Sequence, residues 1–548
     1  MNGSDNSMAD MPAITAASRR AVLGGFGASA LAVLAEGPAL AAGPRPVVET
    51  TLGRVRGIRE DGVSVFRGLP FAASTGGANR FLPPQPRAPW AGIREAVKPG
   101  FSTPQVDSSP FSVSSAIEKM DEDCLFLNVY TPAATRQRKL PVMVWLHGGG
   151  WWVGAGSSPG SQGHVLARLG DVVVVTINHR LNLFGHLRLE DSDERFADSA
   201  NTGVLDMVAA LRWVSSNIAA FGGDPGNVTI FGQSGGGSKV VSLMAAPAAK
   251  GLFHKAIAQS CSGSLRLAGV AEAARMAQGL SAQIGVPLGN GKAWQALPME
   301  QLIAAHAKVN RPFRPVMDGR TFTRHPFGPD APPTAAGIPF MTGNTATETW
   351  HALRADPKNF SLEIGDVENR LDRFLHTDRT GTRRILELCR GMNPNAAPSD
   401  LLAMITTEQM YVRNTTRGAL LQSRNNAPVY SYVFSWETPV DGGRWHSPHG
   451  LDLPFIFGPK TWDWLIGSGP QIAPLTAMMI GTWAAFAHKG DPNNRLLPQW
   501  PRFEENRRTK MLLGLPSRAQ DHHGQELRDA LSGSPYFEYT EGGNFVRP

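Results

Sequence analysis

The chain has few cysteines: Cys124, Cys261 and Cys389 are the only three among 548 residues. Their number is odd, and no two of them have the short CxxC spacing, which argues against both a disulfide framework and a zinc site. Each is expected to be a small buried hydrophobic side chain. No other ligand cluster is evident, so we expect neither a metal ion nor an organic cofactor.

Long hydrophobic runs are also scarce. The main one, Gly24–Ala35, is diluted with Gly and Ala and is shorter than the roughly 20 residues that span a bilayer. It follows the pair Arg19-Arg20 and precedes Ala39-Leu40-Ala41, a small-residue cleavage pattern. Residues 1–41 therefore resemble a twin-arginine signal, whose machinery exports folded proteins. We expect a periplasmic or secreted protein without stable membrane insertion; an uncleaved membrane anchor is the alternative.

Charged residues make up only 18% of the chain, and the formal net charge is +7. The basic residues form only short clusters such as Arg136–Lys139 and Arg507–Arg508. A nucleic-acid-binding protein usually concentrates its positive charge, so we expect no nucleic-acid partner. An attraction for anionic substrates or cell-surface polymers stays open, because summed positive charge raises the encounter rate with anions.

A serine lies between an apolar run and a helix-compatible pattern. Val228–Phe231 is predicted to be a buried strand, and Lys239–Ala246 to be part of a helix. The turn between them contains Gly232-Gln233-Ser234-Gly235-Gly236, a G-x-S-x-G motif. Flanking glycines allow a sharp turn that presents the Ser234 hydroxyl beside a helix N-terminus. The motif indicates a catalytic nucleophile, although such a pentapeptide also occurs by chance.

A second predicted strand, ending at Leu146, is followed by His147-Gly148-Gly149-Gly150-Trp151-Trp152. Successive glycines leave backbone N–H groups able to converge on one point, as an oxyanion hole for acyl transfer requires. We predict that the amides of Gly149, Gly150 and Gly235 are its donors. A flexible glycine loop is the alternative interpretation.

Further short motifs occur along most of the chain in a fixed order. They are Val65–Ala72, Arg80–Pro84, Glu122–Tyr130, Asn201–Gly203 with Asp206, Ala219–Thr229 and Gly490–Asn493. With the two glycine-rich motifs, they make the chain resemble the type-B carboxylesterases, the α/β-hydrolase family that includes bacterial para-nitrobenzyl esterases and the cholinesterases. The resemblance extends from about Thr51 to about Gly514.

The resemblance implies the partners of the serine. Glu348 stands at the position of the family's catalytic acid, although Thr347 and Thr349 replace the family's common Asp and Gly beside it. A capped carboxylate at a helix start is the alternative for Glu348. His449 is followed by Gly450 and matches the family's base, whereas the nearby His446 lacks such a glycine. The implied triad is Ser234, Glu348 and His449, in the chain order of α/β-hydrolases.

The chain departs from the family at several positions. Gln233 replaces the usual Glu before the nucleophile, which makes activity on choline-like esters less expected, and Gly235 replaces the usual Ala. Thr103 stands where an upstream cysteine normally pairs with the equivalent of Cys124, so this disulfide is expected to be absent. Three side chains are assigned to the substrate pocket, with simple packing as the alternative for the tryptophans: Trp151, Trp152 and Gln233.

The predicted fold class is α/β, with a mostly parallel sheet covered by helices on both faces. Residues 42–548 are expected to form one α/β-hydrolase domain, in which the mostly helical segments 268–311 and 364–421 build a cap. The expected function is an exported serine hydrolase of carboxylic esters. An inactive cholinesterase-like binding module and an acyltransferase or amidase are the alternatives. Xenobiotic, aryl, polyester and polyacid esters all remain possible substrates, and the sequence does not determine the oligomeric state.

Overall fold

The computed structural model describes residues 44–106, 119–134, 137–189, 191–262, 265–309, 313–537 and 545–546. The chain divides into two compact units, Met1–Pro44 and Arg45–Pro548. Of the first unit only Pro44 is described, so the predicted export signal over residues 1–41 lies outside the described residues. Every helix and strand of the described chain belongs to the second unit.

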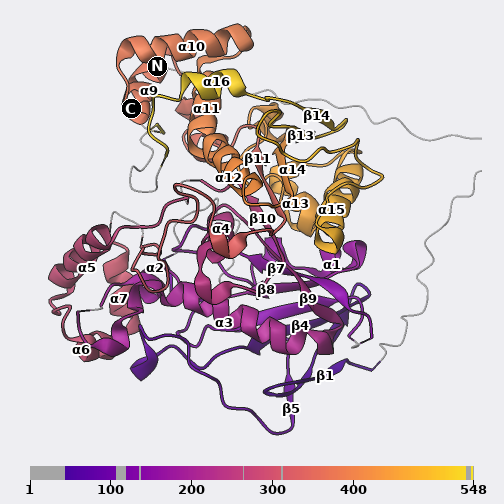
Figure 1. Ribbon diagram of the computed structural model, residues 1–548. Helices are drawn as coiled ribbons and strands as arrows, with labels where there is room; N and C mark the ends of the chain where they lie inside the picture. Colours follow the sequence, from indigo (N-terminus) through magenta and orange to yellow (C-terminus); the bar gives the residue numbers. More distant parts are fainter. Residues whose placement is uncertain are drawn as a thin grey trace, which may run out of the picture. The chain divides into compact units, whose positions relative to one another are not determined.

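The described part of this unit contains an eleven-stranded sheet in the order β14-β13-β12-β11-β10-β9-β7-β8-β6-β4-β3 (Figure 1). From β13 to β8 in this order, each strand is parallel to the next. The remaining pairs, β14 with β13 at one edge and β8, β6, β4 and β3 toward the other, are antiparallel. The bounds are β3 Ile58–Glu60, β4 Val63–Pro70, β6 Phe126–Thr131, β7 Leu140–Leu146, β8 Val173–Ile177, β9 Gly223–Gln233, β10 Lys255–Gln259, β11 Phe340–Thr345, β12 Val429–Phe434, β13 Lys510–Leu513 and β14 Arg518–Gln520. A smaller sheet contains β1 Val47–Thr50, β2 Gly53–Arg56 and β5 Ile93–Glu95.

Helices connect the strands and cover the sheet (Figure 1). Their bounds are α1 His164–Gly170, α2 Asn182–His186, α3 Thr202–Asn217, α4 Gly235–Ala245, α5 Val270–Ile284, α6 Gly291–Ala296, α7 Met299–His306, α8 Trp350–Leu353, α9 Ile364–Leu375, α10 Arg379–Met392, α11 Pro398–Thr407, α12 Arg413–Ser423, α13 Pro454–Phe457, α14 Asp463–Ile466, α15 Ile472–Lys489 and α16 Gln525–Ala530. A π-helical turn over Glu408–Val412 joins α11 to α12. The structure thus confirms the predicted helical character of 268–311 and 364–421 where these segments are described.

The core lies on both faces of the sheet. In β7, Val142, Val144 and Leu146 pack in one hydrophobic cluster with side chains of α3 and α4, whereas Met143 and Trp145 pack in another with α13 and α15. Side chains alternate along a strand, so a continuous apolar run such as β7 can serve two cores. The predicted mostly parallel sheet with helices on both faces is confirmed.

Several motif residues hold this framework together. Arg80 and Glu122 form a buried ion pair, with a 2.6 Å bond from Arg80 Nε to Glu122 Oε1. Arg180 donates to both carboxylate oxygens of Asp206, at 2.8 and 2.7 Å, and both residues are buried. Buried charges are tolerated when they are paired in this bidentate way. Each of these buried charged side chains therefore has a partner of opposite charge that accounts for its burial.

The cysteines are as expected. All three are buried and none is in a disulfide. The Thr103 hydroxyl lies 3.4 Å from Cys124 Sγ, so Thr103 does stand opposite Cys124, and it also donates to the carbonyl of His179 at 2.6 Å. The absence of this loop disulfide, predicted from the sequence, is confirmed.

One further segment of the described chain is long and strongly apolar. The continuous helical stretch Glu194–Phe221, which includes α3, is long and apolar enough to cross a membrane by length and composition. However, 67% of its most apolar window is buried inside the protein. A core helix of a large α/β protein passes the same test, because it too is apolar on several faces.

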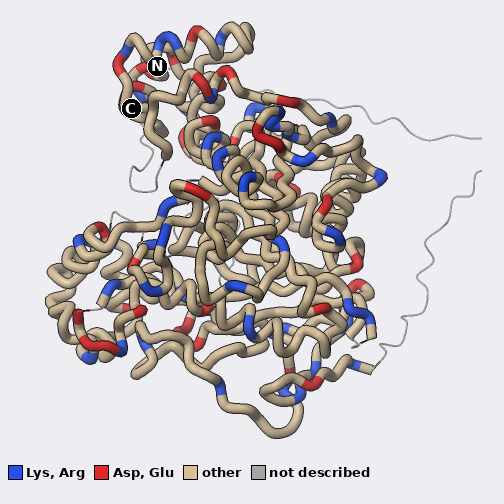
Figure 2. The backbone as a smooth tube through the Cα atoms, in the orientation of Figure 1, with Lys and Arg blue, Asp and Glu red and all other residues tan. Residues whose placement is uncertain are grey.

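Lys and Arg are interspersed with Asp and Glu along the described backbone (Figure 2). Many of them form surface ion pairs, such as Arg138 with Asp171 and Arg424 with Glu505. The positive excess is therefore spread over the fold, as its sequence distribution predicts.

Candidate active site

Ser234 occupies a sharp turn between β9 and α4. Its backbone angles are φ 59° and ψ −122°, a conformation that a non-glycine residue adopts only when its surroundings hold it there. The Ser234 N–H donates to the carbonyl of Gln259 on the neighbouring strand β10, at 2.9 Å. Gly232 and Gly236 approach each other so closely that a Cβ on Gly232 would lie 2.5 Å from the Gly236 carbonyl carbon. The glycines around Ser234 are therefore required by the turn.

Glu348 and His449 form a hydrogen-bonded pair. Glu348 follows β11 and is fully buried, and one of its carboxylate oxygens, Oε2, contacts His449 Nδ1. The other, Oε1, accepts from the Ser260 hydroxyl at 2.6 Å and from the Thr345 N–H at 2.8 Å. A carboxylate fixed in this way keeps the proton of the neutral imidazole on Nδ1 and leaves Nε2 as an acceptor.

The Gln233 side chain is hydrogen-bonded to this acceptor nitrogen. Its Nε2 lies 3.0 Å from His449 Nε2, and because an amide nitrogen only donates, the imidazole nitrogen accepts. The Ser234 hydroxyl has no hydrogen-bond partner among the residues that the structure describes. The structure thus brings Gln233, Glu348 and His449 together, with Ser234 next in sequence to Gln233, but the Ser234 to His449 bond is not formed. Gln233 contacts the imidazole, and its role in the substrate pocket stays a prediction.

The glycine loop after β7 lies against the start of α4. Gly149 and Gly150 have φ angles of 84° and 62°, which favour glycine, and a Cβ on Gly235 would overlap the backbone of Gly150. Within the described chain, no acceptor takes the N–H groups of Gly149, Gly150 or Gly235. Three open amides, one of them at a helix N-terminus, favour an anion.

The two tryptophans differ. Trp151 is buried and packs edge-on against His186, with 5.3 Å between ring centroids. Trp152 is partly exposed, and its ring lies against Gly150, where a Cβ would overlap it. Of the two, Trp152 is the one that borders the open amides.

Sequence reasoning missed a buried lysine behind this loop. Lys239, on α4, is fully buried, and its ammonium donates to the carbonyl of His147 at 2.7 Å. Burial holds the pKa of Lys239 well below its usual value, and among the described residues no carboxylate forms an ion pair with it. Its only sequence signal was a charged residue in an apolar helical pattern.

Asp452 is a second buried acid near the pair. It accepts from Gln259 Nε2 at 2.8 Å and from the Tyr432 hydroxyl at 3.2 Å. Burial raises the pKa of Asp452 to about 6, and the nearby Glu348 carboxylate acts in the same direction. Asp452 lies three residues after His449 in the sequence, where no local pattern indicates its burial.

Within the described residues no group of three or more His, Cys, Asp and Glu could hold a metal ion. The expectation of a cofactor-free site stays a prediction.

At one edge of the mostly parallel sheet, the site combines a nucleophile turn, a buried acid beside a histidine and a loop of open amides. These are features of serine hydrolases. The carboxylesterase family model matches residues 44–530. The chain belongs to the carboxylesterase family. Its fold is the α/β-hydrolase fold, and it is a carboxylic-ester hydrolase, as the resemblance implied.

Similar proteins match over nearly their whole length. The para-nitrobenzyl esterase of Bacillus subtilis is 33% identical and covers 88% of this chain and 98% of its own. The phenmedipham hydrolase of Pseudarthrobacter oxydans is 32% identical and covers 86% of this chain and 95% of its own. Among solved structures, the carboxylesterase EST55 of Geobacillus stearothermophilus is 36% identical with a TM-score of 0.79, covering 89% of this chain and 100% of its own.

Proposed function

We propose that this carboxylesterase works through an acyl-enzyme on Ser234, with His449 as general base and Glu348 as the residue that orients it. The observation that carries the proposal is the strained turn of Ser234, directly after Gln233, whose side chain already contacts His449. A small exchange at His449 Nε2, from the Gln233 amide to the Ser234 hydroxyl, completes the arrangement. Catalytic hydrogen bonds are often incomplete in the absence of substrate.

The chemistry follows from these groups. His449 Nε2 accepts the Ser234 proton while Oγ attacks the ester carbonyl, and the N–H groups of Gly149, Gly150 and Gly235 stabilise the oxyanion. The intermediate collapses when His449 returns the proton to the leaving alcohol. Water, deprotonated by His449, then attacks the acyl carbon, and His449 returns the proton to Ser234 Oγ as the acid leaves. Glu348 stays ionised and stabilises the imidazolium during both steps.

The test is hydrolysis of p-nitrophenyl acetate and butyrate by the protein from Ala42 onward, with Ser234→Ala beside it. We expect the variant to lose at least about 10⁴-fold in kcat. A serine-directed phosphonate should add one adduct to Ser234 by intact mass. Ser242→Ala, on the same helix, removes a buried hydroxyl without a partner among the described residues and should keep both activity and adduct.

Folded wild-type protein without turnover and without an adduct would overturn the proposal and favour a binding module. Faster alcoholysis than hydrolysis in the presence of an alcohol would instead identify an acyltransferase.

The proposal includes export through residues 1–41 and a substrate range of xenobiotic or polyacid esters. The relatives named for para-nitrobenzyl ester, phenmedipham and pyrethroid hydrolysis support the xenobiotic part. For export, the double variant Arg19→Lys with Arg20→Lys should retain the enzyme in the cytoplasm on cell fractionation. Unchanged periplasmic or secreted activity in this variant would exclude the twin-arginine route.

A further inference from the structure

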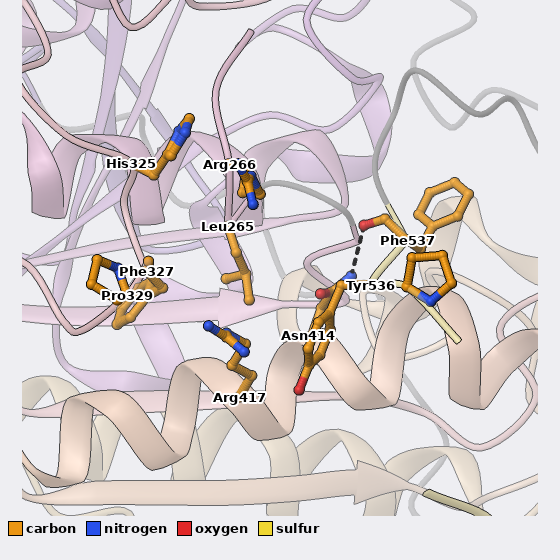
Figure 3. Close-up of a pocket in the computed structure, with 11 residues that line it drawn as sticks. Leu265, Arg266, His325, Phe327, Pro329, Asn414, Arg417, Tyr536 and Phe537 are labelled. Atoms are coloured by element: carbon orange, nitrogen blue, oxygen red, sulfur yellow. Dashed lines mark hydrogen bonds between the residues drawn. The ribbon is translucent and has the colours of Figure 1, made fainter. Parts of the chain in front are cut away.

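A cavity of about 540 Å³ lies between the segment that follows β10 and helix α12 (Figure 3). Phe327, Pro329 and Tyr536 supply apolar and aromatic walls, and Arg266, His325 and Arg417 supply the polar ones. No acidic side chain lines it among the described residues. The cavity therefore combines apolar surface with basic side chains.

Arg417 is the central cation of this cavity. Figure 3 shows its side chain reaching from α12 toward Leu265, with Phe327 and Pro329 on one side and Tyr536 on the other. Its guanidinium stacks on the Tyr536 ring at 4.7 Å, which holds the planar group in place. In the described part of the chain, no acceptor takes its N–H groups and no carboxylate pairs with it. A half-buried, oriented guanidinium with unused donors matches the two oxygens of a carboxylate.

The neighbouring groups strengthen this preference. His325 Nδ1 accepts from the Leu267 N–H at 3.1 Å, so the neutral ring carries its proton on Nε2 and can only donate from there. Burial lowers the pKa of His325, and Arg266, Arg314 and Arg324 lower it further, which favours the neutral ring. Arg413 also stacks on the Tyr536 ring, at 4.6 Å.

Two segments of the chain link the wall of the cavity to residues of the proposed active site. Helix α12 directly continues the turn that carries Tyr411, whose ring lies 5.2 Å from the ring of His449. At 1.5 Å per helical residue, Arg417 lies roughly 9 Å along the axis from Tyr411. On the opposite wall, Leu265 follows Cys261, whose Cβ would lie 3.4 Å from a Cβ on Gly237 in the first turn of α4.

We propose that this cavity binds the free carboxylate of an ester substrate whose acyl chain extends from Ser234 to Arg417. The enzyme would then prefer esters in which an apolar spacer of about 10 Å separates the scissile carbonyl from a carboxylate. Phe327, Pro329 and Tyr536 contact the spacer, and Arg417 and His325 bind the carboxylate. The proposal rests on Ser234 being the nucleophile.

The test compares pairs of p-nitrophenyl esters that differ only in the terminal group of the acyl chain. One member of each pair is the monoester of a dicarboxylic acid, and the other is the neutral fatty-acid ester of the same length. We expect the ratio of kcat/KM, charged over neutral, to be largest near an eight-carbon chain, about 10 Å long, and smaller for four carbons. Arg417→Met should lower this ratio about tenfold at eight carbons, because one charge-assisted pair is lost.

Two controls make the result specific. Arg424→Met, at the end of the same helix, removes an exposed arginine that pairs with Glu505 and should leave the ratio unchanged. In wild-type enzyme, the ratio should fall when NaCl rises from low salt to about 0.5 M, which needs no variant that might misfold.

An eight-carbon ratio that is the same in wild type and in Arg417→Met, with normal hydrolysis of the neutral ester and a phosphonate adduct on Ser234, would overturn the carboxylate proposal alone. Loss of neutral-ester hydrolysis and of the adduct in folded wild type would overturn the proposed function instead.

Discussion

At the scale of single residues, the contact between Gln233 and His449 defines the resting state of the site. The Gln233 amide donates to the imidazole nitrogen that accepts the serine proton in the proposed mechanism. An uncharged donor at this position orients the imidazole with Nε2 as the acceptor. The Glu that is common in the family would instead favour the protonated ring.

Gln233→Glu should therefore shift the acid limb of kcat/KM to higher pH by about one unit, since an opposite charge within hydrogen-bonding distance stabilises the imidazolium. The measurement is the pH profile of p-nitrophenyl butyrate hydrolysis. Gln233→Met, which removes the hydrogen bond without adding charge, should leave the limb where it is. If both variants move the limb equally, the shift has a steric cause and not an electrostatic one.

Lys239 offers a second residue-scale prediction. Because burial lowers its pKa in the folded protein, the unfolded chain binds more protons, and wild-type stability rises with pH up to about 10. Lys239→Met should thus raise Tm near pH 7, and this gain should shrink toward pH 10. The same variant should lower kcat about tenfold, because the His147 carbonyl at the start of the amide loop loses its anchor. A gain in Tm that is constant with pH would show that the lysine is not a buried titrating group.

At the scale of elements, the sequence predicted strongly periodic segments well. Strand β7 and helix α4 were predicted because their apolar residues follow the pattern of a buried strand and of a helix. Strand β9 is longer than predicted, because Gly223 already pairs with Leu140 of β7, whereas the polar and turn-forming residues before Val228 interrupt the pairing. Strand β11, with Gly343 and Asn344, carries too weak a local pattern to be recognised.

The residues of the site also differ in how well the local sequence predicts them. The turn at Ser234 and the loop at Gly149 are local motifs, so their chemistry could be predicted from neighbouring residues. Glu348 and His449 lie far away in sequence and became visible only through the family resemblance. The contacts of Ser260 with Glu348 and of Lys239 with His147 depend on tertiary packing, which no local pattern encodes.

His446, three residues before His449, connects the histidine loop to helix α11. Its Nε2 lies 3.3 Å from Asp400 and its Nδ1 lies 3.4 Å from Glu437. The hydrogen bond with Asp400, followed by that with Glu437, raises the pKa of His446 to about 9. A raised folded pKa stabilises the fold fully below pH 6.5, and this contribution disappears as pH rises through 9.

We expect His446→Gln to lower Tm at pH 6 and to match wild type at about pH 10, measured by thermal unfolding across this range. The effect should be modest, because the side chain is partly exposed. Asp400→Asn should show the same pH dependence. A loss of Tm that persists at pH 10 would assign the role of His446 to packing.

At the scale of the whole molecule, stability comes from packing and ion pairs without any disulfide. Cys124, Cys261 and Cys389 are all buried, and burial raises the pKa of Cys124 and of Cys389 to about 12. Buried thiols with such pKa values are almost entirely protonated at pH 8 and react slowly. The proposed export after folding in a reducing compartment agrees with this, because disulfides do not form in such a compartment.

The folded protein should accordingly react with no equivalents of a thiol reagent at pH 8, and with three after unfolding in guanidinium chloride. Tm should be the same with and without dithiothreitol, because no covalent crosslink limits the entropy of the unfolded chain. Fewer than three reactive thiols in the unfolded protein would reveal a disulfide and weaken the link between cysteine content and export. A thiol that reacts in the folded state would mark local opening of the cluster that buries it, and hydrogen exchange would locate that opening.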